Sequence, residues 1–198
     1  MGDPDRRDEV DAILRARAGD DTGFAWLVDR YARRVHNVAY RMLRDRGEAE
    51  DVTQHAFLNA WKALDRFDTA RPFRNWLLRI TTNLCRNRIA ARQVRRHLLD
   101  PIGGDPDTPE PMDLRLPAAD ASDAERVAAA IDRLPERYRL PVILRYQHEL
   151  SVAEVAAVMG IPVATAKTHL HRARAALRTV LERPETPPPP SGTEGQSP

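Results

Sequence analysis

The chain has few of the residue types that stabilise secreted or membrane proteins. Its 198 residues contain one cysteine, Cys85, so no disulfide can form within the chain. No stretch approaches the roughly 18 apolar residues of a membrane span, and the first ten residues contain no apolar core for a signal peptide. We therefore expect a cytoplasmic protein that works in a reducing compartment.

Sequence signals for catalysis are also poor. The six histidines are scattered, and His169 and His171, two positions apart, cannot share one helical face as zinc ligands. We find no phosphate-cradling glycine loop, no nucleophile elbow and no carboxylate cluster with metal-ligand spacing. We predict that Cys85 is a packing residue rather than a reactive thiol. The sequence thus predicts a protein that is not an enzyme and uses no cofactor or metal.

Charge is distributed unevenly, although the formal net charge is only +2. Arginine dominates the basic residues, because Lys62 and Lys167 are the two lysines. Residues 71–98 contain eight arginines and no acid, whereas residues 99–125 contain eight acids and one arginine. The planar guanidinium suits phosphates and base edges. This pattern predicts a basic surface followed by an acidic tether.

Apolar spacing predicts three helices in the first part of the chain. One spans residues 24–43, the second follows the turn Asp45-Arg46-Gly47, and the third begins after Pro72. We expect Phe73, Trp76 and Trp61 to pack in the core. The predicted buried stripe of the second helix is Val52, Ala56, Phe57, Ala60, Trp61 and Leu64.

The composition then divides the chain into four parts. Residues 1–97 form the first helical domain, and residues 98–121, rich in Pro and Asp, form a flexible acidic linker. Residues 122–183 form a second helical domain, and residues 184–198, with six prolines, form a disordered tail. We expect an all-α fold of two small helical domains joined by a flexible linker.

The second domain carries a helix-turn-helix pattern. Ser151 and Glu154 form a capping box, and Gly160 marks the turn before the next helix. In this motif the second helix lies in the major groove of DNA. Residues 161–181 contain four basic residues and no acid. The alternative is an ordinary helical hairpin with a solvated basic face. Candidate base-facing residues are Thr165, Lys167, Thr168, His169, His171 and Arg172.

The basic helix of the first domain combines arginines with amides and aromatic residues. Asn75 and Asn83 lie between the arginines, and Phe67 lies in the loop before the helix. Aromatic planes stack on unpaired bases and amides read base edges, so the mixture suits single-stranded DNA. Phe67 lies outside the periodic stripe, which makes it the better stacking candidate.

Four segments resemble the extracytoplasmic-function (ECF) group of bacterial sigma factors. Residues 48–54 (EAEDVTQ) with Phe57, and residues 73–80 (FRNWLLRI) with Asn83, resemble sigma region 2. Residues 134–139 (LPERYR) and 151–174 resemble region 4 and its helix-turn-helix. The departures Asn87, Ala90 and His169 mean that base preferences cannot be copied from relatives.

This resemblance implies a function in promoter-directed transcription initiation, with core RNA polymerase and promoter DNA as partners and an anti-sigma factor as regulator. The implied polymerase-binding residues are Glu50, Asp51, Gln54 and Phe57. The implied minus-35 residues are Arg145, Lys167, Thr168, His171 and Arg172. The implied minus-10 residues are Phe67, Arg79, Asn83 and Arg86. The alternative function is a stand-alone helix-turn-helix regulator that binds operators as a dimer without polymerase.

Overall fold

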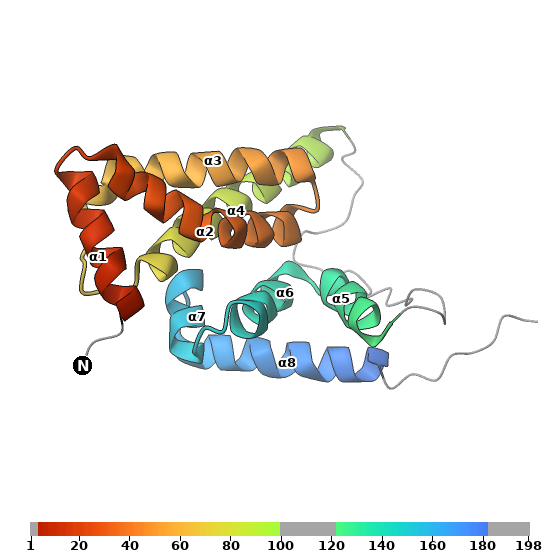
Figure 1. Ribbon diagram of the computed structural model, residues 1–198. Coiled ribbons are helices and arrows are strands. Elements are labelled where there is room, and N and C mark those ends of the chain that lie inside the picture. Colours follow the sequence, from red (N-terminus) through yellow and green to blue (C-terminus); the bar gives the residue numbers. More distant parts are fainter. Residues whose placement is uncertain (1–3, 100–121, 182–198) are drawn as a thin grey trace, which may run out of the picture.

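The computed structural model describes residues 4–99 and 122–181, and every regular element in those ranges is a helix (Figure 1). The all-α prediction is therefore confirmed. The predicted Pro-rich tail and most of the predicted linker lie outside the described residues. In chain order the elements are α1 (Pro4–Arg17), α2 (Asp21–Leu43), α3 (Arg46–Ala63), η1 (Leu64–Arg66), α4 (Phe73–Leu99), α5 (Asp123–Arg133), α6 (Glu136–Val142), η2 (Ile143–Gln147), α7 (Val152–Met159) and α8 (Val163–Leu181).

Helices α2, α3 and α4 are the three that the apolar spacing predicts. Aspartates begin two of them: Asp20 accepts a hydrogen bond from the Thr22 amide at 2.9 Å, and Asp45 accepts one from the Glu48 amide at 2.8 Å. A carboxylate at a helix N-terminus satisfies unpaired amides and favours the helix dipole. Local sequence therefore fixes where α2 and α3 begin.

Helix α1 was not predicted, because its buried face consists mostly of small residues. Ala12, Ile13 and Ala16 are buried, together with the carboxylate of Glu9. The helix lies against the start of α2 at Gly23, where an added Cβ would lie 2.4 Å from the Ala12 carbonyl oxygen. Gly23 thus allows the two backbones to approach each other closely.

The second group of helices contains the predicted helix-turn-helix. Ser151 and Glu154 form the expected capping box at the start of α7, and Gly160 ends that helix with a left-handed φ of 67°. Helix α8 follows directly as the second helix of the motif. A second capping box, Ser122 with Glu125, begins α5. The local signals for this group are therefore confirmed.

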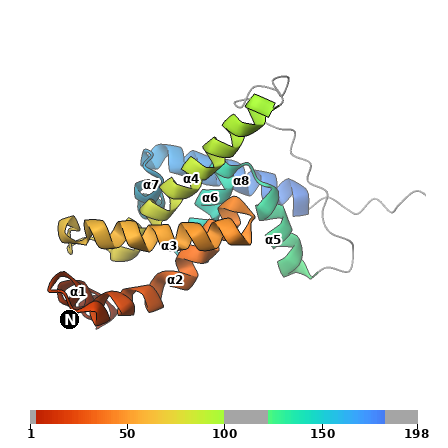
Figure 2. The same ribbon diagram turned by 90° about the horizontal axis from the view of Figure 1, so that it is seen from above.

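The two groups of helices share a hydrophobic core, which the sequence did not indicate. Helix α7 lies against α4 (Figure 2). Helix α6 contacts α2. One continuous cluster contains Leu78 and Cys85 of α4, Met42 of α2, and Ile143 and Met159 of the second group. Within the described residues, the two halves therefore form a closed arrangement.

Candidate functional surfaces

The predicted base-facing residues of α8 lie on one exposed face. Lys167, Thr168, His171 and Arg172 are all exposed, and their spacing places them on adjacent turns. The Thr168 hydroxyl donates to the Ala164 carbonyl at 3.0 Å, and Arg172 Nη1 lies 3.4 Å from the Tyr138 hydroxyl oxygen. All four side chains are therefore accessible to a partner without movement of any other element.

Two neighbouring candidates are less available. His169 is half-buried, and its ring packs edge-on against Tyr138 with centroids 5.7 Å apart. Burial, with Arg137 and Arg172 nearby, lowers the pKa of His169 below its usual value. Thr165 is also half-buried. Both belong to the inner edge of α8 rather than to its exposed face.

Arg145 lies on η2, outside the helix-turn-helix. It is exposed, and its Nη1 donates to the Leu150 carbonyl at 2.8 Å, just before α7 begins. The side chain therefore lies beside the loop that leads into the motif.

The predicted minus-10 residues of α4 share a face that borders the second group of helices. Arg79 and Asn83 are exposed, whereas Arg86 is half-buried. Arg86 Nη1 donates to the carbonyl of Met159, at the end of α7, at 3.0 Å. The Arg86 end of this face is therefore occupied by α7 in the closed arrangement.

Phe67, the predicted stacking candidate, is packed in the core. The side chain is 6% exposed, and its ring packs against Phe73 and Trp76 with centroids 5.5 Å and 4.7 Å apart. The reason is the loop itself, which folds back and adds Phe67 to the aromatic cluster at the start of α4. In this arrangement the ring has no free face on which a base could stack.

A second base-reading candidate is also occupied. The Asn75 amide nitrogen donates to the carboxylate of Glu154, at the start of α7, at 2.9 Å, and Arg74 pairs with the same carboxylate at 3.5 Å. These contacts, with the Arg139 guanidinium donating to the Met42 carbonyl at 3.3 Å, join the two halves. Asn75 therefore belongs to the contact between the halves.

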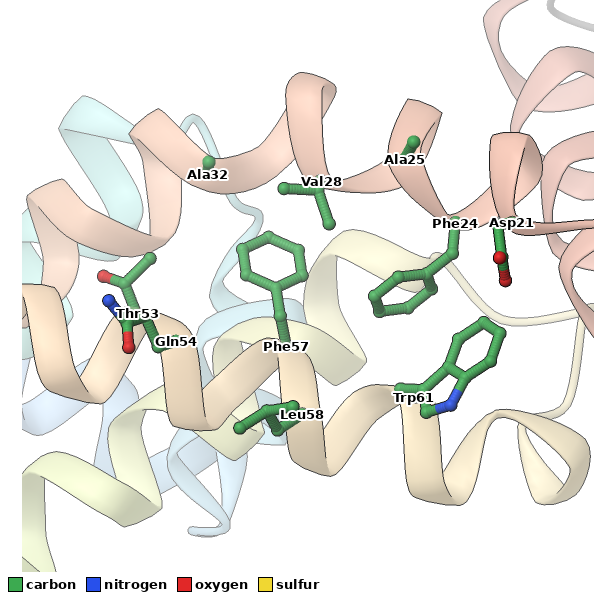
Figure 3. Close-up of a pocket in the computed structure, with 10 residues that line it drawn as sticks. All are labelled: Asp21, Phe24, Ala25, Val28, Ala32, Thr53, Gln54, Phe57, Leu58 and Trp61. Carbon is green, nitrogen blue, oxygen red and sulfur yellow. The ribbon is translucent and has the colours of Figure 1, made fainter.

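An apolar groove of about 630 Å³ runs between α2 and α3 (Figure 3). Phe24 packs edge-on against Phe57, with centroids 6.3 Å apart, and against Trp61 at 4.8 Å. Of the predicted polymerase-binding residues, Gln54 and Phe57 line the groove. The lining residues are Asp21, Phe24, Ala25, Val28, Ala32, Thr53, Gln54, Phe57, Leu58 and Trp61.

The other two predicted polymerase-binding residues lie nearer the start of α3. Glu50 and Asp51 are both exposed; Glu50 pairs with Arg46 at 3.0 Å and Asp51 with Arg88 at 3.6 Å. The exposed surface of α3 thus changes along the helix from acidic to apolar. Surface ion pairs of this kind contribute little to stability, so breaking them to bind a partner's groups costs little free energy.

Two exposed residues of the groove, Leu58 and Trp61, are not among the predicted polymerase-binding residues. Trp61, which is predicted in the buried stripe, is 40% exposed, and Leu58 is 52% exposed. The available signal was Leu58, a large apolar side chain adjacent to the buried stripe rather than on it. Large apolar side chains gathered on a surface mark an interaction site.

No group of three or more His, Cys, Asp or Glu residues positioned to bind a metal ion is found among the described residues. Burial raises the pKa of the Cys85 thiol to about 12, which matches the predicted packing role. In the ranges that the structure describes, no helix has both the length and the apolar character needed to span a bilayer.

Comparison with known proteins accounts for both halves of the chain. The family model of Sigma-70 region 2 matches residues 27–95, and that of Sigma-70 region 4 matches residues 124–177. The ECF RNA polymerase sigma factor SigW of Bacillus subtilis is 35% identical over 181 residues, covering 85% of this chain and 94% of that protein. The RNA polymerase sigma factor CnrH of Cupriavidus metallidurans is 33% identical over 189 residues, covering 88% of this chain and 96% of that protein.

A solved structure extends the likeness to the fold. CnrH in complex with the cytosolic domain of CnrY has a TM-score of 0.63 and 28% identity, covering 88% of this chain and 97% of that one. Sigma factors are initiation factors rather than enzymes, as the sequence predicted. The chain belongs to the ECF RNA polymerase sigma factors, with a region 2 unit in α2–α4 and a region 4 unit in α5–α8.

Proposed function

We propose that this sigma factor binds core RNA polymerase through α3 and recognises promoter DNA through α8 and α4. The observation that carries the proposal is the set of surfaces on one chain. The described side chains of α4 and α8 include no acid, whereas α3 offers an apolar groove beside Glu50 and Asp51. A factor that joins an enzyme to DNA requires both kinds of surface.

For the minus-35 element we assign Arg145, Lys167, Thr168, His171 and Arg172. Helix α8 carries four of these on one exposed face, and the major groove of B-DNA accepts a helix in this orientation. Lysine and arginine at this surface also neutralise phosphates, so binding should weaken as salt concentration rises.

For the minus-10 element we assign Arg79, Asn83 and Arg86 of α4, together with the loop at Phe67–Arg71 that packs against the start of this helix. The amide and the two guanidinium groups lie about one helical turn apart along one face. Because Phe67 is packed in the core, we assign it to shaping the loop.

For core polymerase we assign Glu50, Asp51, Gln54 and Phe57, and we add Leu58 and Trp61 from the groove. Partly exposed aromatic and aliphatic side chains are the usual energetic centre of a protein interface. A helical partner fits an elongated apolar groove of this kind.

We further propose that this sigma factor acts in the cytoplasm and is regulated by an anti-sigma factor. The solved structure of sigma factor RpoE from Bartonella quintana contains its anti-sigma factor NepR, and it supports the fold of this chain at 21% identity. CnrH was likewise solved with CnrY. The anti-sigma proposal is supported by these assemblies of related proteins.

The test is transcription from genomic DNA by purified core polymerase, with and without the protein. We expect defined start sites that appear only when the protein is present, with two shared sequence elements upstream. The test variant combines Leu58→Asp with Trp61→Ala. It should lose core binding, and its unchanged binding to minus-35 duplex serves as the control. DNA binding without core and without new start sites would instead support a stand-alone regulator.

A further inference from the structure

We propose that α1 braces the loop between α3 and α4, and that Arg6, Glu9 and Arg17 are positioning residues for minus-10 recognition. This inference rests on the proposed function of that loop and of α4. Helix α1 lies before the residues that the region 2 family model matches, 27–95.

Two arginines of α1 bind the backbone of the loop. Arg17 donates to the Leu64 carbonyl through Nε at 3.1 Å and Nη2 at 2.8 Å, and Nη2 also donates to the Phe67 carbonyl. Arg6 Nη2 donates to the carbonyls of Thr69 at 2.7 Å and Arg71 at 2.5 Å. Two side chains of one helix thus hold four carbonyls between residues 64 and 71.

Glu9 connects this contact to the start of α4. The residue is 5% exposed, and its carboxylate accepts hydrogen bonds from the Arg6 guanidinium and the Tyr31 hydroxyl. It also accepts from the Phe73 amide, the first of α4, at 3.4 Å. Burial beside Glu9 raises the pKa of Tyr31 to about 12, so this hydroxyl remains a donor. Glu9 therefore ties α1 to α2, α4 and, through Arg6, the loop.

The brace leaves the opposite side of the loop exposed. Asp68 and Arg71 are exposed and lie 3.4 Å apart as an ion pair, and the Asp68 carboxylate accepts from the Ala70 amide at 2.9 Å. With Phe67 packed beneath, these contacts fix the loop in one conformation. A loop ordered in advance avoids the entropy cost of ordering on DNA and keeps its groups at defined positions.

The experiment uses the full-length protein bound to core polymerase. Arg6→Met with Arg17→Met removes the donors and keeps long apolar stems, and Arg7→Met, an exposed arginine of the same helix, is the matched control. The probes are a single-stranded minus-10 oligonucleotide and versions with single base changes. We expect the double variant to lose about tenfold in discrimination between these oligonucleotides, as for loss of a base contact. Core binding and minus-35 duplex binding should stay unchanged.

Hydrogen exchange provides an independent measurement of the brace. Amides between residues 64 and 71 should exchange faster in the double variant than in Arg7→Met, while those of α8 stay unchanged. If the double variant does not fold, Arg17→Lys, which keeps one donor group, should give a smaller change in both measurements. A folded variant with unchanged base discrimination would overturn the proposal, even if exchange became faster. If the wild-type complex itself showed no minus-10 base preference, the proposed function would fail first.

Discussion

The two surfaces that we propose face DNA are both basic, but they are built in different ways. The minus-35 surface lies mainly on α8, where Lys167, Thr168 and Arg172 are exposed without help from other elements. The minus-10 surface combines α4 with a loop held by α1, and its Arg86 contacts the Met159 carbonyl of α7. The first surface is formed largely by one helix, and the second by contacts among α1, the loop, α4 and α7.

This difference separates what each half needs before it can bind DNA. A rigid helix presents its side chains in the free protein, so binding on α8 requires little rearrangement. Full exposure of Arg86 and Asn75 requires α7 to leave α4, because both side chains bond to that helix. We therefore expect DNA binding at α4 to be coupled to the separation of the two halves, and binding at α8 to be independent of it.

The largest effect on stability should come from Gly23→Ala. This change disturbs the contact of α1 with α2, and so the minus-10 surface that α1 supports, but not α8. An added Cβ would lie 2.4 Å from the Ala12 carbonyl oxygen and 2.7 Å from the Ala16 nitrogen, both backbone atoms that cannot move aside. We expect a loss of about 3 kcal/mol in the free energy of unfolding, at the upper end for overpacking. Chemical denaturation measures it.

Gly47→Ala is the matched control, because its added Cβ would meet nothing closer than the Asp45 carboxylate at 3.5 Å. In a helix this change should stabilise by about 0.5 to 1 kcal/mol. Equal effects at Gly23 and Gly47 would contradict the close contact between α1 and α2.

Arg172→Ala tests the independent surface. If Arg172 reads a base, minus-35 duplex binding should weaken by about 1 to 3 kcal/mol and lose base preference at one position. The loss should be the same in the free protein and in the polymerase complex, because the side chain is exposed already. Arg178→Ala, an exposed arginine farther along α8, is the comparison. Unchanged affinity and base preference in Arg172→Ala would exclude the assigned contact.

The same contrast decides how much the sequence could predict. The capping box at Ser151 and the turn at Gly160 are local signals, and they located α7 and α8 correctly. Exposure of the α8 face followed from its spacing. The role of α1 depends on contacts between residues 47 to 65 positions apart, such as Arg17 with Leu64 and Arg6 with Arg71. No local pattern records contacts of that kind.

Phe67 shows a second limit. Its position outside the helical stripe was read correctly, but burial depends on how the loop folds back onto Phe73 and Trp76. The shared core of the two halves was missed for a related reason: Cys85 and Ile143 each fit the core of their own unit, and the pairing between units is a tertiary property. The sequence predicts candidate surfaces, and the structure shows which of their residues are covered.

Acid pH should weaken the closed arrangement through His148. The ring is 7% exposed, and burial beside Arg34 of α2 and Arg74 of α4 lowers its pKa to about 4. Above the ordinary pKa of about 6.5 the His148 ring is neutral whether it is buried or exposed. The loss of stability therefore begins only below about pH 6.5. As pH falls further, the exposed ring binds a proton that the buried ring does not. The free energy of unfolding therefore falls by about 1.4 kcal/mol per pH unit. Comparing the free energy of unfolding of wild type and His148→Gln at about pH 6.5 and about pH 5.5 measures this difference. Identical pH dependence would contradict the assignment, and the exposed His171→Gln should behave like wild type.

The smallest effect should come from Glu154→Gln, which weakens the contact between the halves directly. Glutamine keeps the capping box of α7 and can still accept from Asn75, but it loses the ion pair with Arg74. A partly exposed pair of this kind contributes about 0.5 kcal/mol.

Cys85 is buried in the shared core and reports opening of the two halves without an added label, because its thiol must be exposed to react with a thiol reagent. We expect reaction about twofold faster in Glu154→Gln than in wild type. Glu125→Gln makes the same change in the α5 capping box, where the Glu125 carboxylate accepts hydrogen bonds from Ser122 of its own half, and should leave the rate unchanged. Equal rates for the two variants would mean that the Glu154 contacts do not hold the halves together.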